Sequence, residues 1–145
     1  MPIDKELLKN TVAAFGITPE DTALERFDLY ARLLTEKNKV MNPTAVDDER
    51  GIVLKHFADS ASLLSVLSLK GGQRVLDVGT GGGLPGVALL ILNPSISLTL
   101  MDSTKKKLDF LSNTLTQLGL SAQLVHLRAE DAGRAPAHRE QYDTV

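Results

Sequence analysis

Residues 74–86 limit what this chain can fold into more than any other stretch. Residues 74–78 are mostly apolar and β-branched, which is typical of a buried parallel strand. Four glycines follow among residues 79–83, and glycine adopts positive φ freely and lets a ligand approach the backbone. Pro85 suits the first turn of a helix predicted over residues 87–92. A strand, a glycine turn and a helix N-terminus in this order predict a cradle for a nucleotide-like ligand.

This loop fits two classes of cofactor. The glycines at 81, 83 and 86 match the dinucleotide pattern G-x-G-x-x-G. Asp77 followed by glycines at 79, 81 and 83 matches the first motif of S-adenosylmethionine-dependent methyltransferases. The acid favours the second class, because a plain dinucleotide fold has no use for a charge at this strand end. The carboxylate there can accept hydrogen bonds from loop amides or face a cationic ligand. A turn without a ligand is disfavoured, because a run of glycines costs conformational entropy on folding.

Composition narrows the class of protein. The chain has 145 residues, with 16 lysines and arginines against 18 acids, so any nucleic-acid binding must come from a local basic face. It has no cysteine, which excludes disulfides, a thiolate nucleophile and cysteine-ligated metal. No apolar run approaches a membrane span, and we expect no secretory signal and a cytoplasmic protein.

Residues 1–70 are expected to form a helical region. A first helix is predicted over residues 4–15. A second should start at Thr18 and Pro19, which form its cap, and run to about residue 38. A third is predicted from about residue 50 to residue 69, with a break near Asp59. Asn38, Asn42 and Pro43 are expected to end the second helix.

Residues 71–145 alternate between strands and helices, as a nucleotide-binding sheet does. Further strands are predicted at residues 96–102 and 122–127, with the first residues of a fourth at 142–145. The helix after the second strand is expected to be capped by Ser103 and closed by Gly119. Residues 132–141 are interpreted as a polar connection. The pattern predicts an α/β fold, with residues 71–145 as the first part of its ligand-binding domain.

Asp102 is the main candidate binding residue outside the loop. It follows Gly81 by 21 positions, at the end of the second predicted strand, where a carboxylate can accept both ribose hydroxyls of an adenosine. Both cofactor classes need this residue, and it could instead stabilise the start of the following helix. Ala129 and Glu130 follow the third strand, where they could contact an adenine edge or form a solvated acidic turn.

Three other groups of polar residues carry weaker signals. His56, Asp59 and Ser60 share a helix face, but neighbours along one helix lack the geometry of a hydrolase triad. We therefore expect these three residues to line a cleft or to cap a helix break. His126 and His138 are isolated, and three scattered histidines predict no metal site. The lysines at 105–107 sit at the helix end that disfavours cations, so they either contact phosphate or form a solvated face.

Taken together, these motifs resemble the bacterial glucose-inhibited division protein B family, which are 16S rRNA small subunit methyltransferases. Residues 76–86, Leu-Asp-Val-Gly-Thr-Gly-Gly-Gly-Leu-Pro-Gly, carry the resemblance, and the Leu-Pro-Gly ending separates this family from the generic methyltransferase loop. The runs at 56–60, 101–103 and 128–130 extend it over nearly all of the chain. Lys37 departs from the family, where tryptophan is expected, and Pro43 is a smaller departure.

The resemblance implies a Rossmann-like class I methyltransferase fold with an N-terminal helical cap. It implies that S-adenosylmethionine is the cofactor and that the small ribosomal subunit, through its 16S rRNA, is the partner, with no metal and no membrane. The cofactor-binding residues that it implies are Gly79, Gly81, Leu84, Asp102, Ala129 and Glu130. The family's next cofactor and RNA contacts would lie past Val145, so we expect an incomplete sheet and no methylation by this chain alone.

The implied acceptor is nitrogen 7 of a guanine, which has a free lone pair and no proton to remove. Attack on a sulfonium methyl group then needs no general base, so we expect no catalytic side chain and a rate set by alignment. An NAD(P)-dependent oxidoreductase that uses the same loop and a non-catalytic nucleotide-binding module are the alternatives.

Overall fold

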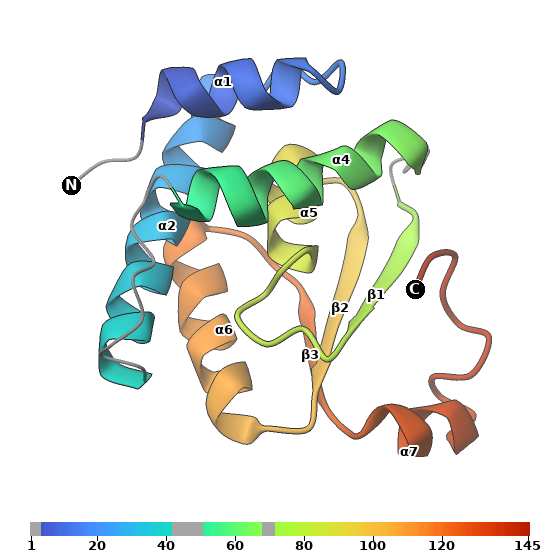
Figure 1. The fold of residues 1–145 in the computed structure, drawn as a ribbon. Helices are drawn as coiled ribbons and strands as arrows, with labels where there is room; N and C mark the ends of the chain where they lie inside the picture. The colour runs from blue at the N-terminus through green and yellow to red at the C-terminus, as the bar shows by residue number, and fades with distance from the viewer. Residues whose placement is uncertain (1–3, 42–50, 68–71) are drawn as a thin grey trace. The chain divides into compact units, whose positions relative to one another are not determined.

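The computed structural model describes residues 4–41, 51–67 and 72–145, which fall into two compact units (Figure 1). The first unit spans Met1–Ser68 and the second Leu69–Val145. The predicted change from a helical to an alternating pattern near residue 70 lies outside the described residues. In the described part of the chain, no helix is long and apolar enough to cross a membrane.

The first unit is helical. Its elements are α1 (Lys5–Ala13), α2 (Asp21–Met41), the π-helical segment η1 (Ile52–Phe57) and α4 (Ala58–Val66). The ring of Phe57 packs against Phe27 and Tyr30 of α2, with ring centroids 4.7 and 5.5 Å apart, and all three side chains are fully buried. These rings tie η1 to α2 in the core of the unit.

Two details of this unit differ from the predictions. The helix expected to start at Thr18 and Pro19 begins at Asp21. The expected break near Asp59 is wrong, because η1 passes directly into α4. Phe57, at the end of η1, is fully buried. Asn42 and Pro43, expected to end α2, lie outside the described residues.

The second unit is built on a parallel sheet. Its elements are β1 (Arg74–Val78), α5 (Gly86–Leu92), β2 (Ser97–Asp102), α6 (Lys105–Leu118), β3 (Gln123–His126) and α7 (Ala129–Arg134). The strand order is β1-β2-β3, with Val75 paired to Leu98 and Leu100 paired to Leu124. The predicted mixed α/β fold with parallel strands is confirmed, because parallel neighbours require crossover helices such as α5 and α6.

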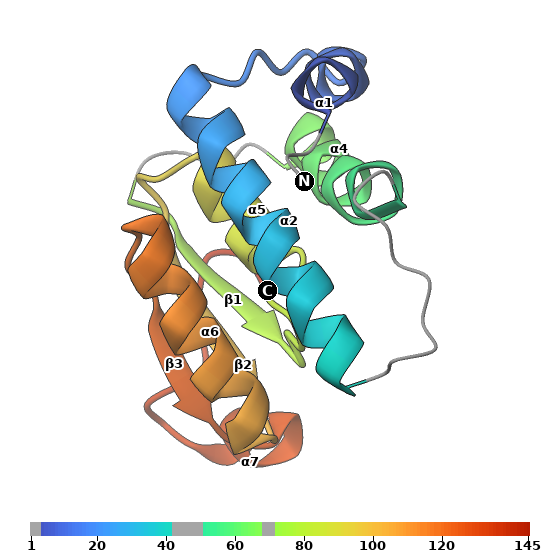
Figure 2. The same cartoon turned by 90° about the vertical axis from the view of Figure 1, so that its left-hand side faces the viewer.

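The helices of this unit cover both faces of its sheet. Figure 1 shows α5 and α6 on one side and α7 with the C-terminal segment on the other, and Figure 2 shows α6 in front of the strands. On the α7 side, Leu76, Met101 and Ala132 form a buried cluster, with Tyr142 packed against it. Ala132 lies in α7 and packs into this cluster, whereas the sequence predicts a polar connection over residues 132–141. That interpretation is wrong for the first three of those residues.

The C-terminal residues lie beside β1, on the edge away from β2. Thr144 forms a parallel bridge to Val75, its carbonyl accepts the Leu76 amide at 2.9 Å, and Asp143 pairs with Arg74. The predicted fourth strand is therefore present as a single bridge. The chain moves from β1 to β2 and β3, and then returns to the other side of β1. In open α/β sheets, ligands bind at the carboxyl ends of strands where the order reverses in this way.

Candidate functional site

The glycine loop between β1 and α5 lies at the carboxyl end of the sheet. Gly79, Gly81 and Gly83 have φ values of 67°, 58° and 100°, which side chains disfavour. The amides of Gly79 and Thr80 both donate to the Met101 carbonyl, at 2.9 and 3.2 Å, so the end of β2 holds the start of the loop. The predicted glycine turn is therefore confirmed, with backbone conformations that need glycine.

Asp77 fastens the two ends of this loop together. One of its carboxylate oxygens accepts hydrogen bonds from the Thr80 hydroxyl at 2.8 Å and the Gly86 amide at 2.9 Å. Burial raises the pKa of Asp77, the two hydrogen bonds oppose this rise, and the charge of Asp102 adds to it. Of the two roles left open for this acid, the structure shows the acceptor of a loop amide.

Asp102 connects the loop to the start of α6. One carboxylate oxygen accepts the Gly81 amide at 3.0 Å and the other accepts the Thr104 amide at 2.8 Å. Burial pushes the pKa of Asp102 upward, but these two hydrogen bonds and the nearby charge of Lys107 outweigh it and lower the pKa below its ordinary value. Asp102 therefore favours its charged form, which can accept further hydrogen bonds.

The same contact corrects the predicted cap of α6. The N-cap residue is Thr104, not Ser103, and it makes no side-chain cap hydrogen bond. The Asp102 carboxylate instead accepts the amide of the N-cap residue Thr104 itself. The predicted closing residue, Gly119, does end α6 in the left-handed conformation, with φ of 69°.

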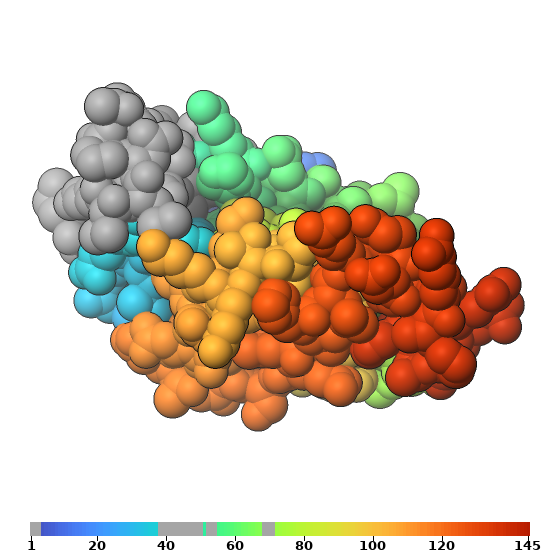
Figure 3. Space-filling view, turned by 90° about the horizontal axis from the view of Figure 1, so that it is seen from below, coloured from blue at the N-terminus to red at the C-terminus, as the bar shows by residue number. Residues whose placement is uncertain are grey.

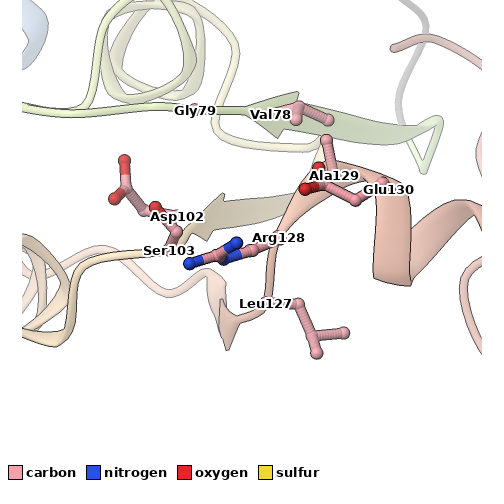
Figure 4. Close-up of a pocket in the computed structure, with 8 residues that line it drawn as sticks. All are labelled: Val78, Gly79, Asp102, Ser103, Leu127, Arg128, Ala129 and Glu130. Carbon is pink, nitrogen blue, oxygen red and sulfur yellow. The ribbon is translucent and has the colours of Figure 1, made fainter.

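A pocket of about 380 Å³ opens where the three strands end, which lies within the size range of small-ligand sites. Figure 3 looks onto this end of the second unit, where the start of α6 (gold) and the segment that contains α7 (red) flank the strand ends. The residues that line the pocket are Val78, Gly79, Asp102, Ser103, Leu127, Arg128, Ala129 and Glu130 (Figure 4). They come from the ends of β1 and β2, from the segments that follow the three strands and from the start of α7.

The structure brings most of the predicted binding residues to this pocket. Gly79, Asp102, Ala129 and Glu130 line it, and Gly81 contacts Asp102 through its amide. Leu84 is not among the lining residues.

Sequence reasoning assigned no part in this pocket to Val78, Ser103, Leu127 and Arg128. Arg128 is the most informative omission, since Figure 4 shows its guanidinium extended across the pocket toward Ser103. Its position directly after the third strand was the available signal, because the carboxyl ends of parallel strands meet at one edge of the sheet.

The other polar residues considered above form no further catalytic group in the described chain. The Ser60 hydroxyl donates to the His56 carbonyl, four residues earlier, at 2.7 Å, so it is bonded to the local helix backbone. A ring nitrogen of His126 contacts the Ser103 carbonyl, and His138 contacts the Tyr142 hydroxyl, both at 2.9 Å. Within the described ranges, no three histidine, aspartate or glutamate side chains gather as metal ligands.

The residues present fit an adenosine ligand. A Cβ atom at Gly79 or Gly81 would meet no other atom within 4 Å, so the loop faces open space in which a ligand can approach the backbone. Asp102 supplies a charged acceptor at the same pocket. The lining also includes the Ser103 hydroxyl and the Glu130 carboxylate, which can form further hydrogen bonds to a bound ligand.

Comparisons with known proteins point to one family. Residues 23–145 match the family model described as rRNA small subunit methyltransferase G. The ribosomal RNA small subunit methyltransferase G of Caldanaerobacter subterraneus subsp. tengcongensis is 42% identical over 95% of this chain and 58% of its own length. Proteins of the same name from Pelotomaculum thermopropionicum and Symbiobacterium thermophilum are 39 and 43% identical, over 100 and 96% of this chain and 61 and 59% of their own. The chain thus spans about three fifths of the length of these curated relatives.

Proposed function

This chain belongs to the rRNA small subunit methyltransferase G family, and we propose that it binds S-adenosylmethionine for methyl transfer to nitrogen 7 of a guanine in 16S rRNA. A methyltransferase family implies a methyl donor. The observation that supports an adenosine-containing donor is the pocket at the strand ends, where Asp102 and the glycine loop meet. Membership of a methyltransferase family favours S-adenosylmethionine over NAD as that donor.

The lining residues divide into groups with separate roles. Asp102 accepts the ribose hydroxyls, since a charged carboxylate is the strongest acceptor for them. Ala129 and Glu130 contact the adenine edge from the rim of the pocket. Gly79 and Gly81 let the rest of the donor approach the backbone. Leu84 lies outside the lining residues, and its contact with the donor stays a prediction.

When bound, S-adenosylmethionine supplies a sulfonium methyl group that a nucleophile can attack directly. Guanine nitrogen 7 carries a lone pair and no proton, so the chain needs no general base. The residues of the pocket therefore contribute by fixing position and by excluding water. A misplacement of about 1 Å is enough to cost roughly a hundredfold in rate. Asp102 and Asp77 support that alignment by holding the loop at Gly81 and Gly86.

Titration calorimetry with the demethylated product, S-adenosylhomocysteine, tests this proposal. We expect one binding site for it and none for NAD, which uses a similar loop in dehydrogenases. Asp102→Asn should weaken the binding by roughly 10- to 100-fold, because a hydrogen bond to a charged group contributes about 1.5–3 kcal/mol.

Asp109→Asn is the matched control, since Asp109 is an exposed acid on α6 that does not line the pocket. It should leave the affinity unchanged. Binding of NAD in place of S-adenosylhomocysteine, or full affinity in a folded Asp102→Asn protein, would contradict the proposal.

A further inference from the structure

We propose that Lys105, Lys106 and Arg128 form a basic rim that binds the phosphates of the RNA strand carrying the target base. This inference rests on the proposed function and assigns part of the RNA surface to named residues. All three residues are exposed and belong to the second unit. We call them the basic rim below.

The three cations lie at the same end of the sheet as the pocket. Lys105 and Lys106 open α6, three and four residues after Asp102, and Arg128 precedes α7. Figure 4 shows the Arg128 guanidinium extended toward Ser103, and away from the Glu130 carboxylate. The positive charge of Arg128 is therefore directed toward the start of α6, where the lysines stand.

The lysines are placed where the fold gives them no benefit. The N-terminus of a helix carries a partial positive charge, and a cation there is unfavourable by a few tenths of a kcal/mol up to about 1 kcal/mol. The first turn of α6 itself has no acidic residue, and the Asp102 carboxylate just before it accepts the Thr104 amide. In the described part of the chain, the ion pairs join Arg32 to Asp28 and Arg74 to Asp143, so none of them neutralises the basic rim.

The place of each cation indicates a ligand that extends beyond the pocket. Arg128 lines the pocket, and it also lines a neighbouring hollow of about 190 Å³ with His126 and Asp131. Lys105 and Lys106 line neither hollow, so a donor held in the pocket does not account for them. Lys107 is left out of the basic rim, because its charge already acts on Asp102.

Acidic residues limit where the RNA backbone can lie. Glu130 and Asp131 are exposed at the start of α7, and they would repel a phosphate on that side. The strand is therefore expected to cross on the side of α6, over Lys105 and Lys106, with Arg128 beside the target base. Because the whole chain carries a formal charge of −2, this local group and not the overall field must attract the RNA.

The test measures binding of a 16S rRNA transcript over a range of salt concentrations. Each phosphate contact contributes about 0.7–0.9 to the slope of log affinity against log salt. Lys105→Gln/Lys106→Gln should lower this slope by about 1.4–1.8. Between 50 and 200 mM salt, the unaltered chain should then lose roughly tenfold more affinity than the double variant.

The control is Lys5→Gln/Lys9→Gln on α1, which removes the same charge and should keep the slope of the unaltered chain. Affinity for S-adenosylhomocysteine should be the same in all three proteins, since neither lysine pair lines the pocket. An unchanged slope in Lys105→Gln/Lys106→Gln, or an equal decrease in the control, would overturn the basic rim. Loss of the proposed function would appear separately, as failure of the unaltered chain to bind S-adenosylhomocysteine.

Discussion

Asp77 and Asp102 end neighbouring strands, and their surroundings move their pKa values in opposite directions. Burial dominates at Asp77 and raises its pKa, whereas hydrogen bonds from two backbone amides and the charge of Lys107 prevail over burial at Asp102 and lower it. The same residue type therefore has two roles at one loop. Asp77 shapes the loop from within, and Asp102 presents a charged group to the pocket.

The raised pKa of Asp77 predicts a specific dependence of stability on pH. Because burial raises the pKa of Asp77 in the folded chain, the contribution of this residue to the free energy of unfolding falls as the pH rises through that raised pKa, above the ordinary value of 3.8. Asp77→Asn lacks this contribution but keeps an acceptor for Thr80 and Gly86. The variant's free energy of unfolding minus that of the unaltered chain should therefore increase from pH 3.5 to 7.

Urea denaturation at each pH measures this difference. The lowered pKa values of Asp102 and Asp143 make stability fall as the pH drops, but they do so in both proteins and largely cancel. A difference that stays flat or decreases with pH would show that folding does not raise the pKa of Asp77.

At the scale of elements, the loop and α5 form one unit because of Gly86. A Cβ atom at this position would lie 2.7 Å from Leu100 Cδ2 and 2.8 Å from the Asp77 oxygen that accepts the Gly86 amide. Only glycine therefore lets α5 start this close to β1 and β2. This contact gives a physical reason for the Leu-Pro-Gly ending of the loop.

Gly86→Ala should lower the free energy of unfolding by about 1–3 kcal/mol, because the added methyl group must displace Leu100 or the Asp77 carboxylate. Gly133→Ala in α7 is the matched control, since a Cβ there meets no atom within 4 Å. The control should raise stability by about 0.4–1 kcal/mol through a smaller unfolded ensemble. Equal effects of the two substitutions in urea denaturation would show that α5 can shift away from β1 at little cost.

Gly81 and Gly119 allow backbone strain to be separated from ligand contact. Both have positive φ, 58° and 69°, and an added Cβ meets no atom within 4 Å at either position. Alanine at either site should cost about 1–2 kcal/mol of stability. Only Gly81→Ala should also weaken S-adenosylhomocysteine binding in calorimetry, by more than about tenfold. A full affinity in Gly81→Ala would mean that the ligand does not approach the loop there.

At the scale of the whole molecule, the pocket belongs to one unit alone. Its lining residues run from Val78 to Glu130, and all of them lie in the second unit. The first unit has a separate core around Phe57, Phe27 and Tyr30. Ligand binding and the packing of the helical unit can therefore be followed independently.

Amide hydrogen exchange on the intact chain checks this separation. Saturating S-adenosylhomocysteine should slow amide exchange most at Gly79, Gly81 and Thr104. The Asp102 carboxylate accepts the amides of Gly81 and Thr104. Amides near Phe27 and Phe57 should change little. Equal protection of both units would contradict a site confined to the strand ends.

Local rules were enough to predict much of this protein. The strand at 74–78, the glycine turn with positive φ and the closure of α6 at Gly119 follow from apolar runs and backbone preferences of single residues. The position of Asp102 at the end of β2 follows from the same pattern. These features depend on neighbours in the sequence, which the sequence itself contains.

Other features required the tertiary structure. The sequence left open whether Asp77 faces a ligand or the loop, because the answer depends on how closely Gly86 returns to β1. The sequence also did not indicate that residues 132–134 are helical or that Arg128 lines the pocket. Both features depend on which faces and strand ends meet in the folded sheet. The sequence determined where the strands end. Only the packing of the sheet decided which side chains come together there, because those contacts join residues far apart in the chain.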